Sequence, residues 1–295
     1  MEERRIAVFG ASGMLGRRAV EALGASETGK THVTGFSSAD CDITDEAAVM
    51  ETVRLCAPDV IVNCAAYTAV DKAESEPDTA DRVNRLGAAY LAKAAKVTDS
   101  LLIHVSTDYV FDGTSGKPYT EDMPTAPLGA YGRSKRLGEE AIEASGCKHV
   151  IIRTQWLYDS EGKNFFLTML RLMGERDQLN VVDDQTGSPT YAVDLARAIA
   201  TVAERYDGQD GTYHFSNGGE CTWYDFAISI AQLANAKTKV NPIPTEQYPT
   251  PARRPRYSTL CKDKIAGTFG VSVSHWRDGL NRCFAQWAML QENRE

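Results

Sequence analysis

The sequence predicts an α/β protein with a doubly wound parallel sheet and a smaller C-terminal lobe. Short apolar segments alternate with amphipathic helical segments through the first half, a pattern typical of strand–helix–strand crossover units. The strand segments are apolar throughout, as expected where helices cover both faces of a sheet. A glycine-rich turn, "GASGMLG", lies between the first strand segment and the first helical segment, where such sheets bind phosphate groups.

The first half contains five expected strands and four expected helices in strict alternation. The strands are expected over residues 4–10, 32–36, 58–66, 100–107 and 149–154. The helices are expected over residues 14–23, 44–56, 79–97 and 131–145. Thr44 is the expected cap of the second helix, and Gly146 follows the fourth, where a glycine commonly ends a helix.

After Thr154 the alternation is looser. The remaining expected elements are helices over 164–174, 191–206 and 222–236, the last capped by Thr222, and a strand over 211–216. Residues 241–255 carry five prolines in fifteen positions, which excludes a helix or a central strand. The expected domains are a dinucleotide-binding core over 1–153, to which 190–214 in part returns, and a substrate-binding lobe over most of 154–295.

Composition narrows the functional classes. The chain is 43% hydrophobic and 24% charged, the proportions of a soluble globular protein. A net charge of −8 argues against a general nucleic-acid surface. No apolar run reaches the ~18–20 residues of a membrane helix. The start "MEERRIAVFG" has no apolar signal core, so we expect a cytoplasmic protein.

The cysteines and histidines indicate neither a disulfide framework nor a metal site. The seven cysteines are scattered and form no Cys-x-x-Cys pair, which is typical of a reduced compartment. The histidines lack the spacing of a zinc site, and each is expected to be exposed or satisfied by local hydrogen bonds. They are His32, His104, His149, His214 and His275.

The glycine-rich turn is the first functional signal. Its spacing is G-x-x-G-x-x-G, and it resembles the version found in the Rossmann-type short-chain dehydrogenases/reductases. Glycines let a pyrophosphate approach the N–H groups at the start of the following helix. The alternative is a tight turn without a ligand. The predicted cofactor-binding residues of this turn are Gly10, Ser12, Gly13, Met14, Leu15 and Gly16.

Two further segments fit a dinucleotide. Asp42 and Ile43 stand where such enzymes usually hold the adenine ring. Ala65, Ala66 and Tyr67 follow the third strand, and ligands of open α/β sheets lie outside the carboxyl ends of the strands. The two small alanines would let the chain pass close to a ribose.

The end of the second strand bears on the choice of nicotinamide cofactor. An acid there would bind the adenosine 2′-hydroxyl and repel a 2′-phosphate, but Gly35–Ser37 offers none. We therefore expect NADPH, with NADH as a possible second cofactor, and expect Asp at position 35 to favour NADH. Arg17 and Arg18 follow the last glycine of the turn and are equally well interpreted as a solvated helix face.

A catalytic group is predicted at the end of the fourth strand. Ser106, Thr107 and Asp108 end this strand, and Tyr131 and Lys135 lie one turn apart on the next helix. Reducing a ketone develops negative charge on oxygen, which must receive a proton. Tyr131 would donate it, Lys135 would lower the tyrosine pKa and bind the cofactor ribose, and Thr107 would hydrogen-bond the substrate oxygen.

Almost the whole chain resembles the dTDP-4-dehydrorhamnose reductases, an extended short-chain reductase family. The segments that carry the resemblance are "YTAVDKAESEPD" (67–78), "STDYVFDGT" (106–114), "PLGAYGRSKRLGE" (127–139), "RTQWLY" (153–158), "NFFLTMLRL" (164–172), "DDQTGSPT" (183–190) and "YPTPARRPRYSTL" (248–260). The resemblance implies reduction of a dTDP-linked 4-keto-6-deoxy sugar to dTDP-L-rhamnose for polysaccharide synthesis. It assigns the catalytic roles to Tyr131, Lys135 and Thr107.

The resemblance also implies the substrate-binding residues. Thr107, Asp108 and Tyr109 would line the sugar site. Trp156 would contact the sugar or base, with core packing as the alternative. Asn164 and Phe165 would lie near the nucleotide, and Arg253 and Arg254 suit a diphosphate, which arginine binds in bidentate fashion.

One departure concerns assembly. Some members of the family dimerise through carboxylates that share a magnesium ion, one of them on the first helix. Here "GRRAVEA" places arginines on that helix, and "SPTYAVDL" places Val193 near the other site. We therefore expect no metal and a monomer or weak homodimer. The alternative function is that of a non-catalytic relative, the regulatory β subunit of methionine adenosyltransferase, or of a reductase for a related 4-keto sugar nucleotide.

Overall fold

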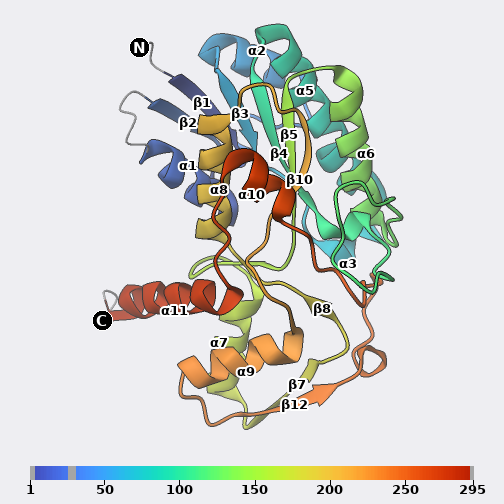
Figure 1. Ribbon diagram of the computed structural model, residues 1–295, viewed down its shortest axis with the longest axis vertical. Coiled ribbons are helices and arrows are strands. Elements are labelled where there is room, and N and C mark those ends of the chain that lie inside the picture. The colour runs from blue at the N-terminus through green and yellow to red at the C-terminus, as the bar shows by residue number, and fades with distance from the viewer. Residues whose placement is uncertain (1–3, 26–30, 293–295) are drawn as a thin grey trace.

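The computed structural model describes residues 4–25 and 31–292, and its larger lobe is built on a parallel sheet (Figure 1). The six strands follow the order β10-β5-β4-β3-β1-β2, and every neighbouring pair is parallel. Their bounds are β1 Arg4–Phe9, β2 Thr31–Phe36, β3 Val60–Asn63, β4 Leu101–Thr107, β5 His149–Thr154 and β10 Gly211–His214. The predicted doubly wound sheet is confirmed.

Helices cover both faces of this sheet, which explains the uniformly apolar strands. Successive side chains point to opposite faces, so Ile6 and Val8 pack in one core cluster, and Ala7 and Phe9 in another. The first cluster is closed by α1 (Met14–Gly24), α8 (Ala192–Arg205) and α10 (Asp263–Phe269). The second is closed chiefly by α2 (Glu46–Cys56), α5 (Gly87–Thr98) and α6 (Ala130–Ser145).

Two expected helices differ from those of the structure, one in its cap and one in its continuity. Helix α2 is capped by Asp45, whose carboxylate accepts the Ala48 N–H at 3.1 Å, and not by Thr44. The helix expected over 79–97 is three segments, α4 (Pro77–Asp81), the π-helical turn η1 (Arg82–Leu86) and α5.

The side chain of Asn84 gives a physical reason for the π-helical turn η1. Asn84 accepts the Tyr67 N–H at 2.9 Å and donates to the Tyr67 carbonyl at 3.1 Å and to the Ser134 hydroxyl at 3.0 Å. A Cβ at Gly138 would lie 2.2 Å from the Asn84 carbonyl, so this glycine lets α6 approach the turn closely. Interruptions of this kind occur where the helical ladder is locally widened.

The smaller lobe has its own apolar core, in which Phe226 and Trp276 are fully buried. It contains α7 (Phe165–Glu175), α9 (Trp223–Leu233), α11 (Trp276–Glu292) and the strand pairs β7 (Gln178–Val182) with β12 (Lys239–Ile243), β8 (Thr186–Gly187) with β11 (Cys221–Thr222) and β6 (Leu157–Tyr158) with β9 (Thr190–Tyr191). Thr222 forms a capping box with Asp225 at the start of α9, as expected. The proline-rich stretch contributes the end of β12 and a short 3-10 turn, η3 (Thr245–Gln247).

The chain crosses between the lobes more than once. Helix α8 packs on α1, and β10 pairs with β5 in the large sheet. Helix α10 also packs on this sheet through Ile265 and Phe269. A domain boundary at residue 153 therefore remains a proposal. No helix within the described parts of the chain has the length and apolar character needed to cross a membrane.

Candidate active site

The glycine turn is shaped by close approaches of the backbone. Gly10 has φ +77°, and a Cβ there would lie 2.6 Å from the Ala65 nitrogen. A Cβ at Gly16 would lie 2.0 Å from the Gly10 carbonyl oxygen. A Cβ at Gly13 would lie 3.2 Å from the Gly10 carbonyl oxygen, which belongs to the turn itself. Among the described residues, no side chain caps the start of α1. The start of α1 therefore offers backbone N–H groups to an anion, which fits the pyrophosphate of a dinucleotide.

The structure brings most of the predicted cofactor residues to the carboxyl edge of β1 and β3. Ser12 and Gly13 are exposed, and Ala65, Ala66 and Tyr67 are half-buried. Two predicted side chains pack into the core instead, so they leave only backbone for a ligand. They are Leu15, which is 6% exposed, and Ile43, which lies against Gly87. The remaining predicted residue of that segment, Asp42, is exposed.

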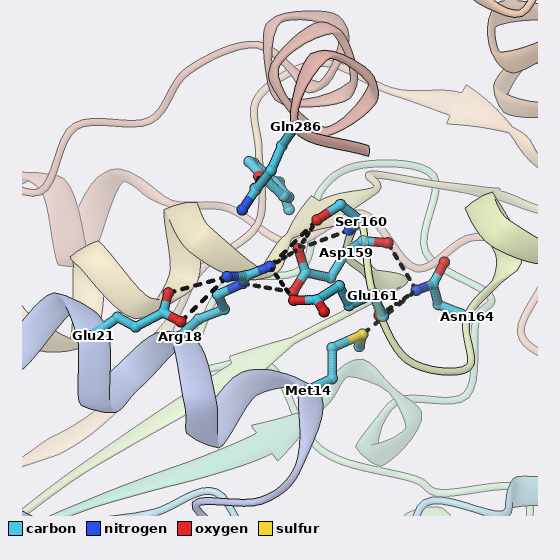
Figure 2. A network of polar contacts seen from close by, with 9 residues as sticks. Met14, Arg18, Glu21, Asp159, Ser160, Glu161, Asn164 and Gln286 are labelled. Atoms are coloured by element: carbon cyan, nitrogen blue, oxygen red, sulfur yellow. Dashed lines mark hydrogen bonds and ion pairs between the residues drawn. The ribbon is translucent and has the colours of Figure 1, made fainter. Parts of the chain in front are cut away.

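Arg18 is not part of a solvated helix face (Figure 2). Its side chain is 7% exposed, and its Nε donates to Asp159 Oδ2 at 2.7 Å. The guanidinium also bonds Glu21 at 3.1 Å, and Ser160 and Glu161 at 3.3 and 3.2 Å. Burial opposes the charge, but the hydrogen bonds and charge of Asp159 raise the Arg18 pKa. Arg18 thus joins the first helix to the segment that precedes α7.

Replacing this arginine is expected to destabilise the fold. Arg18→Met leaves the Asp159 carboxylate, 1% exposed, without its partner, and breaking one side of a buried ion pair typically costs about 3–5 kcal/mol. Urea unfolding measures the loss. The matched control is Arg171→Met on α7, whose ion pair is exposed and worth about 0–1 kcal/mol. Equal losses in the two variants would show that the buried network does not contribute to stability.

The end of β2 differs from its expected form in two ways. A Cβ at Gly35 would lie 2.7 Å from the Ala11 Cβ, so Asp at position 35 would strain the turn and is a poor test of cofactor choice. An acid is also present after all, since Asp40 folds back and accepts the Ser37 N–H at 2.8 Å and its hydroxyl at 2.6 Å. These bonds lower the pKa of Asp40.

Two of the predicted catalytic side chains, Tyr131 and Thr107, lie together where α6 begins beside the end of β4. Tyr131 is 9% exposed and Thr107 is 5% exposed. The Tyr131 ring stands edge-on to Tyr109, with 5.6 Å between ring centroids. A Cβ at Gly132 would lie 2.2 Å from the Tyr109 carbonyl, so glycine at this position lets α6 approach the turn η2 (Asp108–Val110).

The expectation that Lys135 lowers the Tyr131 pKa is wrong for this structure. Burial raises the pKa of Tyr131 to about 12; the Thr107 hydroxyl opposes the shift and the Asp108 charge adds to it. Lys135 instead points at β4, where its Nζ donates to the Val105 carbonyl at 2.7 Å. Burial lowers the Lys135 pKa to about 8, against the charge of Glu139. Tyr131 therefore keeps its proton near neutral pH.

Asp108 has an unusual environment for a carboxylate. It is 1% exposed, and burial raises its pKa to about 7 against the hydroxyls of Ser258 and Thr107. The Thr107 hydroxyl donates to Asp108 Oδ1 at 3.0 Å. The charges of Arg254 and Asp71 act on the Tyr109 pKa, which burial raises, so these side chains lie in the same neighbourhood.

The predicted aromatic residue Trp156 belongs to a stacked cluster. Trp156 is half-buried with φ +47°, and its ring stacks on Trp223 at 3.6 Å between centroids. Phe165 lies 4.7 Å from Trp223 and 5.6 Å from Phe226. No local pattern indicated Trp223, because it comes from α9, more than sixty positions away.

Two predicted polar ligands have other partners. The Asn164 amide caps α7 by accepting the Leu167 N–H at 3.1 Å and donates to the Asp159 carbonyl at 2.9 Å. Arg254 forms an ion pair with Asp71 at 2.8 Å. Its neighbour Arg253 is exposed. A polar group that the sequence did not indicate is Gln155, whose Oε1 accepts the Ser258 hydroxyl at 2.9 Å and the Ser188 N–H at 3.1 Å.

Among the described residues, no group of three or more His, Cys, Asp and Glu side chains could hold a metal ion.

The fold and this edge of the sheet define an oxidoreductase of the extended short-chain dehydrogenase/reductase class. The glycine turn and the predicted catalytic residues Thr107 and Tyr131 lie on the carboxyl side of the sheet.

Comparisons with known proteins identify the family. The model of the RmlD substrate binding domain matches residues 4–289. A dTDP-4-dehydrorhamnose reductase of Sinorhizobium fredii is 41% identical, with 99% of each chain covered, and one of Escherichia coli is 42% identical over 94% of this chain and 96% of its own. The structure of a dTDP-4-dehydrorhamnose reductase from Bacillus anthracis in complex with NADP has a TM-score of 0.91 and 37% identity, with 97% of this chain and all of that chain covered. The chain belongs to the dTDP-4-dehydrorhamnose reductase family.

Proposed function

We propose that this protein reduces the 4-keto group of dTDP-4-dehydro-6-deoxy-L-mannose to give dTDP-L-rhamnose, with NADPH as the reductant. The observation that carries the proposal is the position of Tyr131, which is buried at the start of α6 beside Thr107 at the end of β4, at the same sheet edge as the glycine turn. When bound, NADPH supplies the hydride. The bacterial relatives named above support the sugar, and the Bacillus anthracis complex supports the cofactor.

The chain's own residues would handle the proton. Tyr131 gives its hydroxyl proton to the substrate oxygen as negative charge develops there. The Thr107 hydroxyl hydrogen-bonds the same oxygen and stabilises that charge. Because the Tyr131 pKa is about 12, the hydroxyl is fully protonated at neutral pH, and transfer is favourable once the oxygen has become an alkoxide.

The remaining roles are proposals of the same kind. The backbone of Gly10–Gly16, with Ala65 and Ala66, would hold the dinucleotide. The stacked pair of Trp156 and Trp223 presents a flat aromatic surface suited to a base or sugar face. The Pro-bounded loop with Arg253 and Arg254 would approach the diphosphate, although Arg254 would have to share its charge with Asp71.

The direct test is oxidation of NADPH, followed by absorbance, with the dTDP-linked 4-keto sugar. UDP- and GDP-linked 4-keto sugars in the same assay test the choice of base. The alternative of a non-catalytic regulatory subunit predicts NADPH binding without turnover. Turnover with the UDP or GDP sugar at equal efficiency would contradict the proposed substrate, and absence of turnover with all three would contradict the reductase itself.

We expect kcat/KM to be higher with NADPH than with NADH, because Gly35–Ser37 contributes no carboxylate of its own to the adenosine ribose. Asp40 is a nearby acid whose charge would oppose a 2′-phosphate. Asp40→Asn keeps a side-chain oxygen for Ser37 and removes the charge, so NADPH should bind about twofold to fivefold more tightly, with NADH unchanged.

Tryptophan fluorescence titration with each cofactor measures both binding constants. Asp99→Asn, an exposed acid at the opposite end of β4, is the matched control. Tighter binding of both cofactors by Asp40→Asn would show that Asp40 does not distinguish them. A tenfold preference of the wild-type enzyme for NADH, about 1.4 kcal/mol, would overturn the choice of NADPH.

A further inference from the structure

Three buried side chains form a hydrogen-bonded chain beneath the proposed catalytic group. Asn63 at the end of β3, His104 in β4 and Lys135 in α6 are each 1% exposed. Asn63 Nδ2 lies 3.0 Å from His104 Nδ1, and His104 Nε2 lies 3.2 Å from Lys135 Nζ. The reductase chemistry described above uses Lys135 but gives no role to the other two.

The direction of these hydrogen bonds is fixed at the Asn63 end. The Ala65 N–H donates to Asn63 Oδ1 at 3.0 Å, and a backbone N–H can only donate. The amide nitrogen of Asn63 must therefore face His104 and donate to its Nδ1. A neutral imidazole that accepts at Nδ1 carries its proton on Nε2, and this N–H points at Lys135. Burial keeps the His104 pKa well below its usual value, so the ring is neutral.

Lys135 completes this chain only as a neutral amine. An ammonium has three donors and no acceptor, so it would place a donor against the His104 Nε2–H. The other tautomer of His104 would accept from the ammonium, but it would turn Nδ1–H against the Asn63 amide donor. Every charged form of Lys135 therefore breaks one buried hydrogen bond in this arrangement.

We propose that Asn63 and His104 are positioning residues that hold Lys135 as the amine and set the pH at which it gains its charge. Charging Lys135 releases it from His104, which leaves the ammonium able to turn from β4 toward the proposed cofactor site. The catalytic consequence rests on the proposed function of Lys135, whereas the hydrogen-bond direction does not.

The other described ionisable groups around Lys135 do not replace the lysine amine as the acceptor of the His104 Nε2–H. Those that act on it are Cys64 and Glu139, with Glu139 paired in turn to Arg136 and Arg153. Burial raises the Cys64 pKa to about 12, so its thiol is protonated. The Glu139 carboxylate is engaged by two guanidiniums at 2.7 and 3.0 Å, which leaves His104 as the side chain whose hydrogen bond to Lys135 depends on the lysine charge.

Nuclear magnetic resonance of the wild-type protein tests the direction without any substrate. With 15N-labelled histidine at pH 9.5, we expect His104 to be the Nε2–H tautomer, and we expect its signal to shift on acidification with the same midpoint as the 13Cε signal of Lys135. Lys135→Met assigns the lysine signal. An Nδ1–H tautomer at pH 9.5, or a His104 signal that ignores the lysine titration, would overturn the proposal.

Asn63→Asp then reverses the direction of the hydrogen bonds from residue 63 through His104 to Lys135, with an almost isosteric side chain. The introduced carboxylate would accept from His104 Nδ1–H, so Nε2 would accept from the lysine ammonium. The Lys135 midpoint should therefore rise by about one pH unit or more, at least tenfold in proton affinity. Asn180→Asp, an exposed asparagine on β7, is the control and should not move it. An unchanged or lower midpoint in Asn63→Asp contradicts the proposal.

The pH dependence of catalysis separates this proposal from the proposed function. The high-pH limb of kcat/KM should follow the shift of the Lys135 midpoint in Asn63→Asp. If the lysine midpoint moves and this limb does not, the catalytic role of Lys135 fails while the hydrogen-bond direction stands.

Discussion

Replacing Tyr131 by phenylalanine is expected to lower kcat by about 100- to 10,000-fold, the typical loss of a positioned general acid. The variant removes one hydroxyl and keeps the ring that packs edge-on against Tyr109. Folding and NADPH binding should therefore be nearly unchanged. Stopped-flow measurement of hydride transfer, with a cofactor titration alongside, separates the chemical step from binding.

The control for this substitution is Tyr90→Phe. Tyr90 lies on α5 and packs against the apolar core between that helix layer and the sheet. It should turn over at the wild-type rate. If Tyr131→Phe also stays within about threefold of wild type, far less than the loss of a general acid, Tyr131 is not the proton donor. The Tyr131 pKa of about 12 adds a second expectation, that the tyrosine itself causes no loss of rate between pH 6 and about 10.

Lys135→Met is expected to be at least as harmful as Tyr131→Phe, with a loss of about 100-fold or more in kcat/KM. It removes the cation proposed to bind the cofactor ribose, so NADPH binding should weaken too, which Tyr131→Phe should not cause. The change also leaves the Val105 carbonyl and His104 Nε2 buried without a partner. Such groups cost about 1–3 kcal/mol each, so the urea midpoint should fall.

The pH dependence of the wild-type enzyme belongs to the same experiment. A lysine with a lowered pKa of about 8 is charged below that pH and loses its charge above it. If the charge is needed, kcat/KM falls above about pH 8, and this limb is lost in Lys135→Met. Lys93→Met, an exposed lysine on α5, is the control. NADPH binding by Lys135→Met at wild-type strength would contradict the proposed contact with the cofactor.

The sequence by itself determined the fold class and indicated the main residues of the proposed site. Apolar strands, helical periodicity and turn glycines are local patterns, and each reports which backbone conformation its own segment can adopt. Gly10 and Gly16 were identifiable for this reason, because only glycine permits the close backbone contacts of that turn. The spacing of Tyr131 and Lys135 likewise follows from one turn of a single helix.

The tertiary structure alone decided what each side chain pairs with and how far it is buried. Arg18 meets Asp159 across 141 positions, and Trp156 stacks on Trp223 from another helix. Lys135 points at His104 and Val105, and burial raises the Tyr131 pKa that Lys135 was expected to lower. Burial sets these pKa values, and burial depends on packing between segments far apart in the chain, which no local pattern encodes.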